Sequence, residues 1–196
     1  PKRIKAMQKI NIGANVFIYP MPVTLVGAKV EDRVNFMTVG WVTRVNAKPP
    51  ILAVGLNKMH YTPEGIRETA TFSVNFPSAD MVEKTDYCGL VSGRKTDKSS
   101  VFRVFYGELK NAPMIEDCPL CQECKLYDIY ELPTNNQFIG EIVAAYTEER
   151  YLTDGKPDIH KMNPLVLTMP DNNYWTVGAH AGKAWGAGKK LKKSKS

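Results

Sequence analysis

Four cysteines are the residues whose type and spacing most directly suggest chemistry. Cys118, Cys121 and Cys124 form a Cys-Pro-Leu-Cys-Gln-Glu-Cys segment, and Cys88 precedes it. Adjacent CxxC steps are typical of metal or redox sites, but zinc and iron–sulfur sites need a fourth ligand, usually from a second pair. Only Cys88 or one of the 3 histidines is available for that position. We therefore favour reduced structural cysteines and keep a regulatory thiol pair and a bound metal as alternatives.

A second group of polar side chains surrounds an expected helix start. Thr62-Pro63-Glu64 is typical of a helix N-terminus, with a capping hydroxyl, a first-turn proline and an acid. Lys58, His60 and Tyr61 lie just before it. Free N–H groups and the positive end of the helix dipole favour phosphate, so these residues are candidates for binding one. The alternative is that they serve only as caps and surface polar groups.

Familiar nucleotide-binding and catalytic motifs are missing. No GxGxxG follows an expected strand, and Gly178–Ala184 imitates a phosphate loop with too few residues between its glycines and Ala184 in place of Ser or Thr. We therefore reject a P-loop. No Ser-His-Asp or Cys-His site can be assigned from spacing alone, so no catalytic residue is named.

The composition favours one globular domain. The chain has 196 residues, of which 43% are hydrophobic and 23% charged. Removing the five lysines of residues 189–196 from the 26 basic residues leaves 21 against 20 acidic residues, so the formal charge of +6 reports the tail. This distribution argues against a nucleic-acid-binding face. We expect residues 1–188 to form the domain and residues 189–196 a disordered basic tail, with contact to an acidic redox partner as the alternative.

The sequence carries no signal for a membrane or for export. No apolar run approaches the roughly 18 residues that a spanning helix needs. Residues 1–9 are basic and polar, unlike a secretory signal, which favours a cytoplasmic protein. A secreted chain whose signal has been removed stays open, because the sequence does not begin with Met.

These candidate residues must be positioned by strands and two short helices. Short β-branched and aromatic runs predict strands, and Ser78 and Gly89 predict the start and end of the second helix. Residues 92–100 are expected to form a polar basic loop, and the Gly/Ala-rich residues 178–188 a short helix. This order predicts a mainly β barrel with helices packed outside it. The expected strands are 23–30, 35–45, 51–56, 71–75, 123–132, 138–146 and 165–169.

Several motifs in order identify a family. Asn35-Phe-Met-Thr38, the Trp41-Val-Thr43 turn, Pro49-Pro50 and residues 54–63 resemble the flavin reductase-like split barrel. Three further segments resemble its flavoredoxin branch, and the resemblance extends over roughly residues 10–188. Those segments are 72–75, 84–89 and 170–175. The resemblance implies a single-domain, Greek-key-like split β-barrel that binds FMN, and a homodimer with the flavin near the subunit contact.

The resemblance also implies a set of FMN-contacting residues. Trp41 would stack on the ring, with core filling as the alternative. Cys88-Gly89 would lie near the flavin or merely pack there, and Lys95 would add charge for the phosphate or be a solvated loop lysine. Trp175 would cover the site or the dimer contact, or fill the core. The complete set is Asn35, Met37, Thr38, Val39, Trp41, Thr43, Asn57, Lys58, His60, Tyr61, Thr62, Cys88, Gly89, Lys95 and Trp175.

The expected activity follows from the cofactor, because a flavin supplies the redox chemistry and the protein supplies position and electrostatics. We expect an oxidoreductase that passes electrons from NAD(P)H or a redox protein through FMN to an acceptor. The first alternative is a flavoredoxin-type carrier between proteins, with ferredoxin-like donors. The second alternative is a binding module without redox chemistry.

Overall fold

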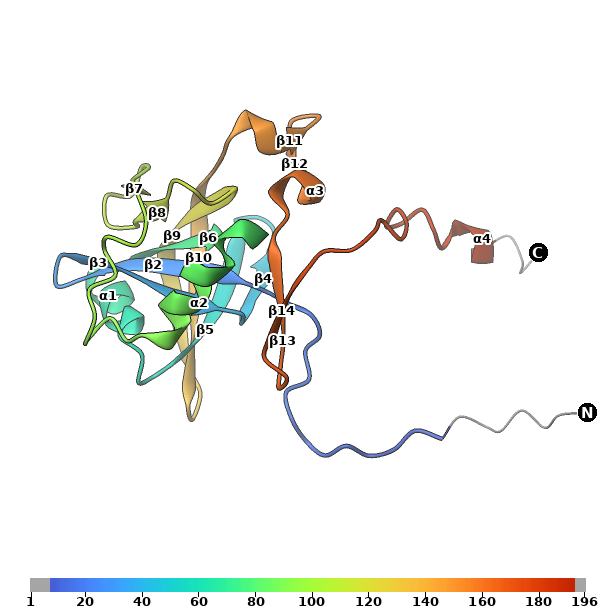
Figure 1. Ribbon diagram of the computed structural model, residues 1–196, viewed down its shortest axis with the longest axis horizontal. Coiled ribbons are helices and arrows are strands. Elements are labelled where there is room, and N and C mark those ends of the chain that lie inside the picture. The colour runs from blue at the N-terminus through green and yellow to red at the C-terminus, as the bar shows by residue number, and fades with distance from the viewer. Residues whose placement is uncertain (1–7, 193–196) are drawn as a thin grey trace, which may run out of the picture.

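One antiparallel sheet forms the body of the protein. The structure is a computed structural model that describes residues 8–192 (Figure 1). Seven strands pair in the spatial order β3-β2-β6-β9-β10-β5-β4, each antiparallel to its neighbours. Their bounds are β2 Thr24–Val30, β3 Arg33–Val39, β4 Val42–Asn46, β5 Ile51–Asn57, β6 Thr71–Phe76, β9 Leu120–Glu131 and β10 Asn135–Thr147.

The sheet curls back on itself. β3 and β4 lie at opposite edges of the hydrogen-bonding order, yet only Gly40 and Trp41 separate them in the sequence. The end of β3 and the start of β4 are three Cα–Cα steps apart and so at most about 11 Å from each other, which means that the edges approach each other at this point. Among the described residues no backbone pairing joins β3 to β4, and the barrel stays split there. The mainly β, single-domain split barrel expected from the sequence is confirmed.

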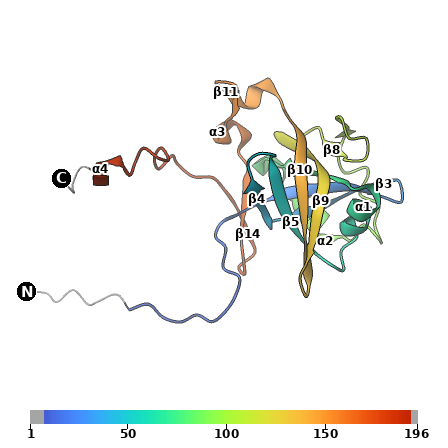
Figure 2. The same ribbon diagram turned by 180° about the vertical axis from the view of Figure 1, so that it is seen from behind.

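Two helices cover the outside of the sheet. α1 (Thr62–Thr69) lies so close to β2 that a Cβ on Gly65 would collide with the Lys29 carbonyl, which explains a glycine inside this helix. A 3₁₀ turn, η1 (Ala79–Met81), leads into α2 (Val82–Leu90), which packs against β3. Figures 1 and 2 show both helices beside the β2–β3 part of the sheet. Their ends therefore meet at β3.

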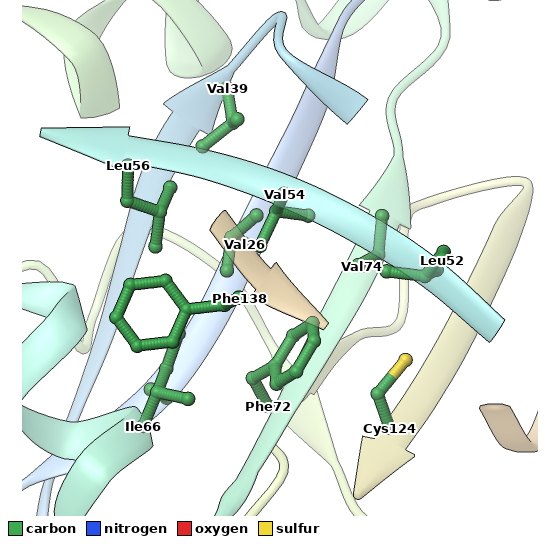
Figure 3. Packing of buried hydrophobic residues seen from close by; sticks show 11 residues of the cluster. Val26, Val39, Leu52, Val54, Leu56, Ile66, Phe72, Val74, Cys124 and Phe138 are labelled. Carbon is green, nitrogen blue, oxygen red and sulfur yellow. The ribbon is translucent and has the colours of Figure 1, made fainter. Parts of the chain in front are cut away.

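Two groups of buried side chains hold these layers together. The first fills the barrel with apolar residues from both halves of the sheet, including Val54, Phe72 and Phe138 (Figure 3). The second lies between α2, the β2–β3 hairpin and the chain that precedes β9, and includes Phe36 and Phe102, whose rings meet edge to face at 5.6 Å. Because β3 carries side chains into both groups, its position is fixed from two sides.

Smaller elements flank the barrel. β1 (Met21–Pro22), β13 (Leu165–Thr168) and β14 (Asn173–Thr176) form a three-stranded sheet that lies beside β4. The pairs β7/β8 and β11/β12 are two-residue strands. Their bounds, with those of the remaining helices, are β7 Val104–Phe105, β8 Met114–Ile115, η2 Glu149–Tyr151, β11 Leu152–Thr153, β12 Lys156–Pro157, α3 Ile159–Met162 and α4 Lys189–Lys192. No helix in residues 8–192 is long and apolar enough to cross a membrane.

Several local expectations were wrong in detail. The single strand expected over 35–45 is broken at Gly40–Trp41, because this is where the chain passes from one sheet edge to the other. Gly89 does not end α2, which continues to Leu90. Residues 178–188 form bends and turns rather than a helix. Of the tail, residues 189–192 include α4, and residues 193–196 lie outside the described range.

Candidate functional site

A cleft of about 280 Å³ opens where β3, the β5–α1 loop and the end of α2 meet. Its walls are polar at the helix ends and include backbone from the loop after α2. The lining residues are Asn35, Met37, Thr38, Met59, His60, Tyr61, Thr62, Cys88, Gly89, Leu90, Val91, Ser92, Gly93 and Lys98. We call this the polar cleft.

A second cleft, of about 310 Å³, adjoins the first along β3. Both are lined by Met37, Thr38 and His60, so together they form one groove. The remaining walls of this second cleft, which we call the ring cleft, are more apolar. They are Val39, Gly40, Trp41, Gly55, Asn57, Asn135, Leu167 and Met169. The groove thus runs from a polar end at α1 to an apolar end beside Trp41.

Lys98 gives the polar cleft a buried positive charge. Its side chain is 3% exposed, and its ammonium donates to the carbonyl oxygens of Cys88 and Val91, both at 3.2 Å. These carbonyls belong to the C-terminal end of α2, where a cation is favoured. Burial lowers the pKa of Lys98, and the structure gives it no carboxylate partner within residues 8–192. A buried ammonium with only neutral acceptors favours an anion in the cleft.

Two arginines add positive charge at the mouth of the cleft. The Arg33 guanidinium donates to the Tyr61 hydroxyl at 3.0 Å and to the Gly93 carbonyl at 3.2 Å. Arg94 pairs with Glu64 in the first turn of α1 and lies 5.1 Å from the centre of the Tyr61 ring. Arg33 and Arg94 therefore hold Tyr61 and the loop after α2 against the start of α1.

A buried hydrogen bond joins β3 to α1. The Asn35 amide donates to the Thr62 hydroxyl at 2.8 Å, and both side chains are at most 3% exposed. Thr62 is the first residue of α1 and Tyr61 occupies the cap position without a side-chain cap bond, so the expected capping role of Thr62 was wrong. Its hydroxyl is instead committed to β3. The first turn of α1 therefore presents backbone N–H groups, and no capping side chain, to the cleft.

Thr38 and Cys88 form the floor between the two clefts. The Thr38 hydroxyl donates to the Thr85 carbonyl, and a Cβ on Gly89 would lie 3.4 Å from the Thr38 side chain. That distance is ordinary van der Waals contact, so Gly89 of α2 lies directly against β3. Burial raises the pKa of the Cys88 thiol to about 11, so the thiol is neutral at physiological pH. Cys88 belongs to the second core group as well as to the cleft wall.

His60 lies at the junction of the clefts. Partial burial and the charge of Lys98 lower the pKa of its imidazole, which favours the neutral form. The backbone N–H groups of Met59 and His60 bond to the Asn57 side chain and carbonyl, at 2.9 and 3.1 Å. These bonds fix the turn that presents His60 to the groove.

The groove brings together most of the residues that the sequence singled out. Eleven line it, with Lys98 as a neighbour that sequence reasoning had not selected. They are Asn35, Met37, Thr38, Val39, Trp41, Asn57, His60, Tyr61, Thr62, Cys88 and Gly89. The remaining four, Thr43, Lys58, Lys95 and Trp175, are not among its lining residues in the single chain.

The loop after α2 carries a buried lysine, Lys98, that sequence reasoning did not select. Lys95 is exposed, whereas Lys98 is buried under the end of α2. Three lysines or arginines occur in residues 94–98, and their types alone do not separate solvated from buried ones. The available signal was the sequence separation from the end of the helix, because a lysine several residues beyond a helix can fold back and donate to the last carbonyls of that helix. Arg33 was missed because it lies in a charged turn.

The cysteines of the CxxCxxC segment are core residues. Cys118 and Cys121 lie in the second buried group and Cys124 in the first, each at most 5% exposed. All are free thiols, and the Cys121 thiol donates to the Ile115 carbonyl at 3.2 Å. Burial raises the pKa values of Cys118 and Cys124. Within residues 8–192 no group of three or more His, Cys, Asp or Glu side chains is arranged to hold a metal ion.

The fold and groove define a split-barrel protein with an anion-suited, partly apolar site, and comparison with known proteins supplies the family. Residues 16–168 match the flavin reductase-like domain, so the chain belongs to that family.

Two solved structures are similar over nearly the whole chain. Flavoredoxin from Methanosarcina acetivorans is 65% identical, with a TM-score of 0.93, over 94% of this chain and 100% of that one. Flavoredoxin of Desulfovibrio vulgaris (Miyazaki F) is 36% identical, with a TM-score of 0.87, over 92% and 100%. An uncharacterised Aeropyrum pernix protein is 30% identical over 76% of this chain, which spans 57% of that relative's length.

Proposed function

We propose that this chain binds one FMN in the groove along β3 and uses it as a two-electron redox centre. The observation that carries the proposal is the buried, carboxylate-free ammonium of Lys98 at the polar end of a groove whose other end is apolar. FMN combines a phosphate dianion with a flat apolar ring. The groove offers a matching environment to each part, and membership of the flavin reductase-like family supports the same cofactor.

The phosphate would lie in the polar cleft. Lys98 supplies a desolvated cation, and Arg33 raises the local potential beside it, whereas the charge of Arg94 is balanced by Glu64. The first turn of α1 contributes its dipole and backbone N–H groups. Ser92, which also lines the cleft, adds a hydroxyl donor. Lys58 and Lys95 are exposed on the same side of the fold and remain candidates for a weaker, screened contribution.

The ring would lie in the ring cleft. Met37 and Trp41 offer apolar surface, and the Trp41 side chain is 41% exposed, so one of its faces is available for stacking. Asn57 and Asn135 border the cleft and supply amide groups for the polar edge of a ring. A Cβ on Gly55 would lie 3.3 Å from Trp41, so glycine at this position lets the indole pack closely against β5.

The roles of the protein groups follow from their charges. FMN supplies the electron-accepting and electron-donating chemistry when bound. Lys98 and the α1 dipole stabilise negative charge, which favours the anionic form of a reduced flavin. The neutral imidazole of His60 is placed to donate or accept one proton at the junction of the clefts. Cys88 stays protonated and fills space.

We propose two alternative uses of this redox centre, and each is supported by a different comparison. The family as a whole supports an oxidoreductase that accepts electrons from NAD(P)H. The 65% identity to a flavoredoxin over 94% of the chain supports a carrier between proteins, with a ferredoxin-like donor. The lysines of residues 189–196 would offer an acidic donor a docking charge. We further propose a homodimer, as the resemblance implies, and a cytoplasmic location.

The test has two parts. Purified protein should show the visible bands of oxidised flavin, and denaturation should release FMN rather than FAD. Anaerobic mixing with NADH, NADPH or chemically reduced ferredoxin should then bleach the bands. Rapid bleaching by a nicotinamide supports the enzyme, and bleaching only by ferredoxin supports the carrier. A colourless protein that takes up no added FMN would overturn both.

A further inference from the structure

Two terminal segments extend away from the body on the same side. Residues 8–20, the N-arm, and residues 177–188, the C-arm, both leave the flank formed by β13 and β14 (Figures 1 and 2). Neither arm is part of a helix or strand within these ranges. The two arms therefore share one face of the molecule.

The arms expose large apolar side chains. Ile10 is 79% exposed and Ile12 67%, and Trp185 of the C-arm is 95% exposed. Isolated exposed hydrophobic residues are ordinary, but a run of them on extended chain marks a surface that is covered by a partner. Trp is also the residue type most enriched among dominant interface contacts.

The arms make few polar contacts with the body. Within the described residues, the observed hydrogen bonds of the two arms stay inside each arm or join the C-arm to α4, apart from one from the Tyr19 hydroxyl to Asp171 at 3.1 Å. Extended chain held by so few bonds does not offset the entropy of ordering it. Its conformation therefore needs contacts that the single chain does not provide.

An apolar groove of about 440 Å³ lies at the base of the N-arm. Val16 and Ile18 form one wall, and Trp41 and Val42 the other. Trp41 and Gly40 also line the ring cleft, so whatever fills this arm groove packs against the ring end of the FMN site. Thr43, which lies outside the flavin groove of its own chain, is part of the arm groove.

We propose that the occupant is a second copy of this chain, whose C-arm lies in the arm groove with Trp185 as its anchor and completes the ring end of the partner's FMN site. The N-arm already lines the groove, which leaves Trp185 of the C-arm, 95% exposed, as the large apolar side chain available to fill it. Groove and arm lie on the same face of one chain, as a two-fold symmetric contact requires. Each subunit then gives an arm and receives one.

Mixed dimers test whether the arm acts on the partner's site. A chain truncated after Val177 keeps its own cleft, and a Lys98→Met chain keeps its arm but loses the buried charge of its anion site. Co-expression with two affinity tags and tandem purification isolates the heterodimer. We expect truncated homodimers to bind FMN at least tenfold more weakly than wild type, and the heterodimer to regain wild-type affinity at half the sites.

The matched control places both changes in one chain. A doubly altered chain paired with wild type leaves the intact cleft without a partner's arm, so its FMN should bind as weakly as in the truncated homodimer. Tight binding in this control, or unchanged affinity in the truncated homodimer, would overturn the proposal. Trp185→Ala provides a milder variant, expected to weaken FMN binding and raise the dimer dissociation constant in sedimentation velocity, should the truncation fail to fold.

This test rests on the proposed FMN function and separates the two failures. Wild-type protein that binds no FMN would overturn the function. The arm exchange would then be judged on assembly alone, by whether wild type sediments as a dimer and Trp185→Ala as a monomer. A monomeric wild-type protein would overturn the arm exchange whatever it binds.

Discussion

The Lys98 ammonium lies 3.2 Å from the carbonyl oxygen of Cys88, at the end of α2 and on the wall of the polar cleft. Among the described residues Lys98 is the one lysine or arginine in the buried class. Burying a cation against neutral carbonyls alone costs free energy, and an anion bound beside it offsets that cost. The contact therefore links the geometry of a helix end to the affinity of the cleft.

Replacing Lys98 by Met should weaken FMN binding strongly. The change keeps the length and apolar stem but removes the buried charge, and a lost charge-assisted contact is worth about 2 kcal/mol or more, roughly 30-fold in affinity. The folded state should change by less than about 1 kcal/mol, because the cost of burying the ammonium disappears with its hydrogen bonds. Fluorescence titration with FMN and urea unfolding measure the two quantities.

Lys95→Met is the matched control for this variant. Lys95 lies in the same loop and is exposed, so solvent and salt screen its charge. We expect its FMN dissociation constant to change less than threefold. Equal losses in the two variants would show that the loop acts through its summed charge and not through the buried ammonium.

The reactivity of Cys88 should follow its raised pKa. Burial raises the pKa of this thiol from 9.0 to about 11. Alkylation by iodoacetamide requires the thiolate, so its rate at Cys88 should be low at pH 8 and should rise until about pH 11. Peptide mapping by mass spectrometry measures it, and bound FMN should slow labelling further because Cys88 lines the cleft. Rapid labelling at pH 8 in the folded protein would contradict the buried placement.

The same shift predicts the direction of a pH effect on stability. A thiol whose folded pKa is raised favours the folded state while it is protonated, so its contribution is complete below pH 9.0 and is lost as the pH rises towards about 11. As the pH rises from 9.0 to about 11, the free energy of unfolding should therefore fall less in Cys88→Ala than in wild type. Thermal unfolding of both proteins between pH 8 and pH 11 provides the comparison.

Glu123 is a buried carboxylate whose removal should destabilise the barrel. It is fully buried on β9 and accepts hydrogen bonds from the backbone of Glu108 and Leu109, at 2.9 and 2.8 Å, and from the Tyr146 hydroxyl at 2.7 Å. In Glu123→Gln one acceptor becomes a donor that faces an N–H group, which should cost about 2 kcal/mol. Urea unfolding measures this cost. The exposed Glu149→Gln should stay within about 0.5 kcal/mol of wild type.

Local patterns predicted the elements better than their junctions. Most expected strands and the two helices that begin near residues 62 and 78 lie where they were expected, because each depends on neighbouring residues, such as the β-branched run of 51–56, whereas the helix expected over 178–188 is absent. The break at Gly40–Trp41 was missed, because it exists only where two sheet edges meet through long-range pairing. Gly89 does not end α2, because the helix continues to Leu90 and packs this glycine against Thr38 of β3.

The candidate site shows the same division. The residues of β3 and of the turn before α1 were selected in the sequence through recognisable motifs, and most of them line the groove. Lys98 and Arg33 were not, because their burial and partners depend on the loop after α2 folding back over α1. Thr43 and Trp175 lie away from the groove of their own chain, so a role for them at the flavin requires the second subunit.

The link between Asn35 and Thr62 should behave as a coupled pair. Asn35→Ala leaves the Thr62 hydroxyl buried without its donor, and Thr62→Val leaves the Asn35 amide without its acceptor. Each single change should cost about 1–3 kcal/mol. The double variant should cost less than the sum of the two by at least about 0.5 kcal/mol. Strictly additive losses in urea unfolding would show that this bond does not hold α1 to β3.

Trp41 and Trp175 provide a final comparison of two exposed indoles. Trp41 is 41% exposed and lines the ring cleft, whereas Trp175 is 53% exposed and its indole N–H donates to the Thr168 hydroxyl at 2.9 Å. Stacking contributes about 1 kcal/mol beyond area burial, so Trp41→Leu should weaken FMN binding roughly fivefold. It should also remove most of the tryptophan quenching that FMN produces on contact. Trp175→Leu should leave both nearly unchanged in the monomeric cleft, and an equal loss there would place Trp175 at the flavin, supplied by the neighbouring subunit.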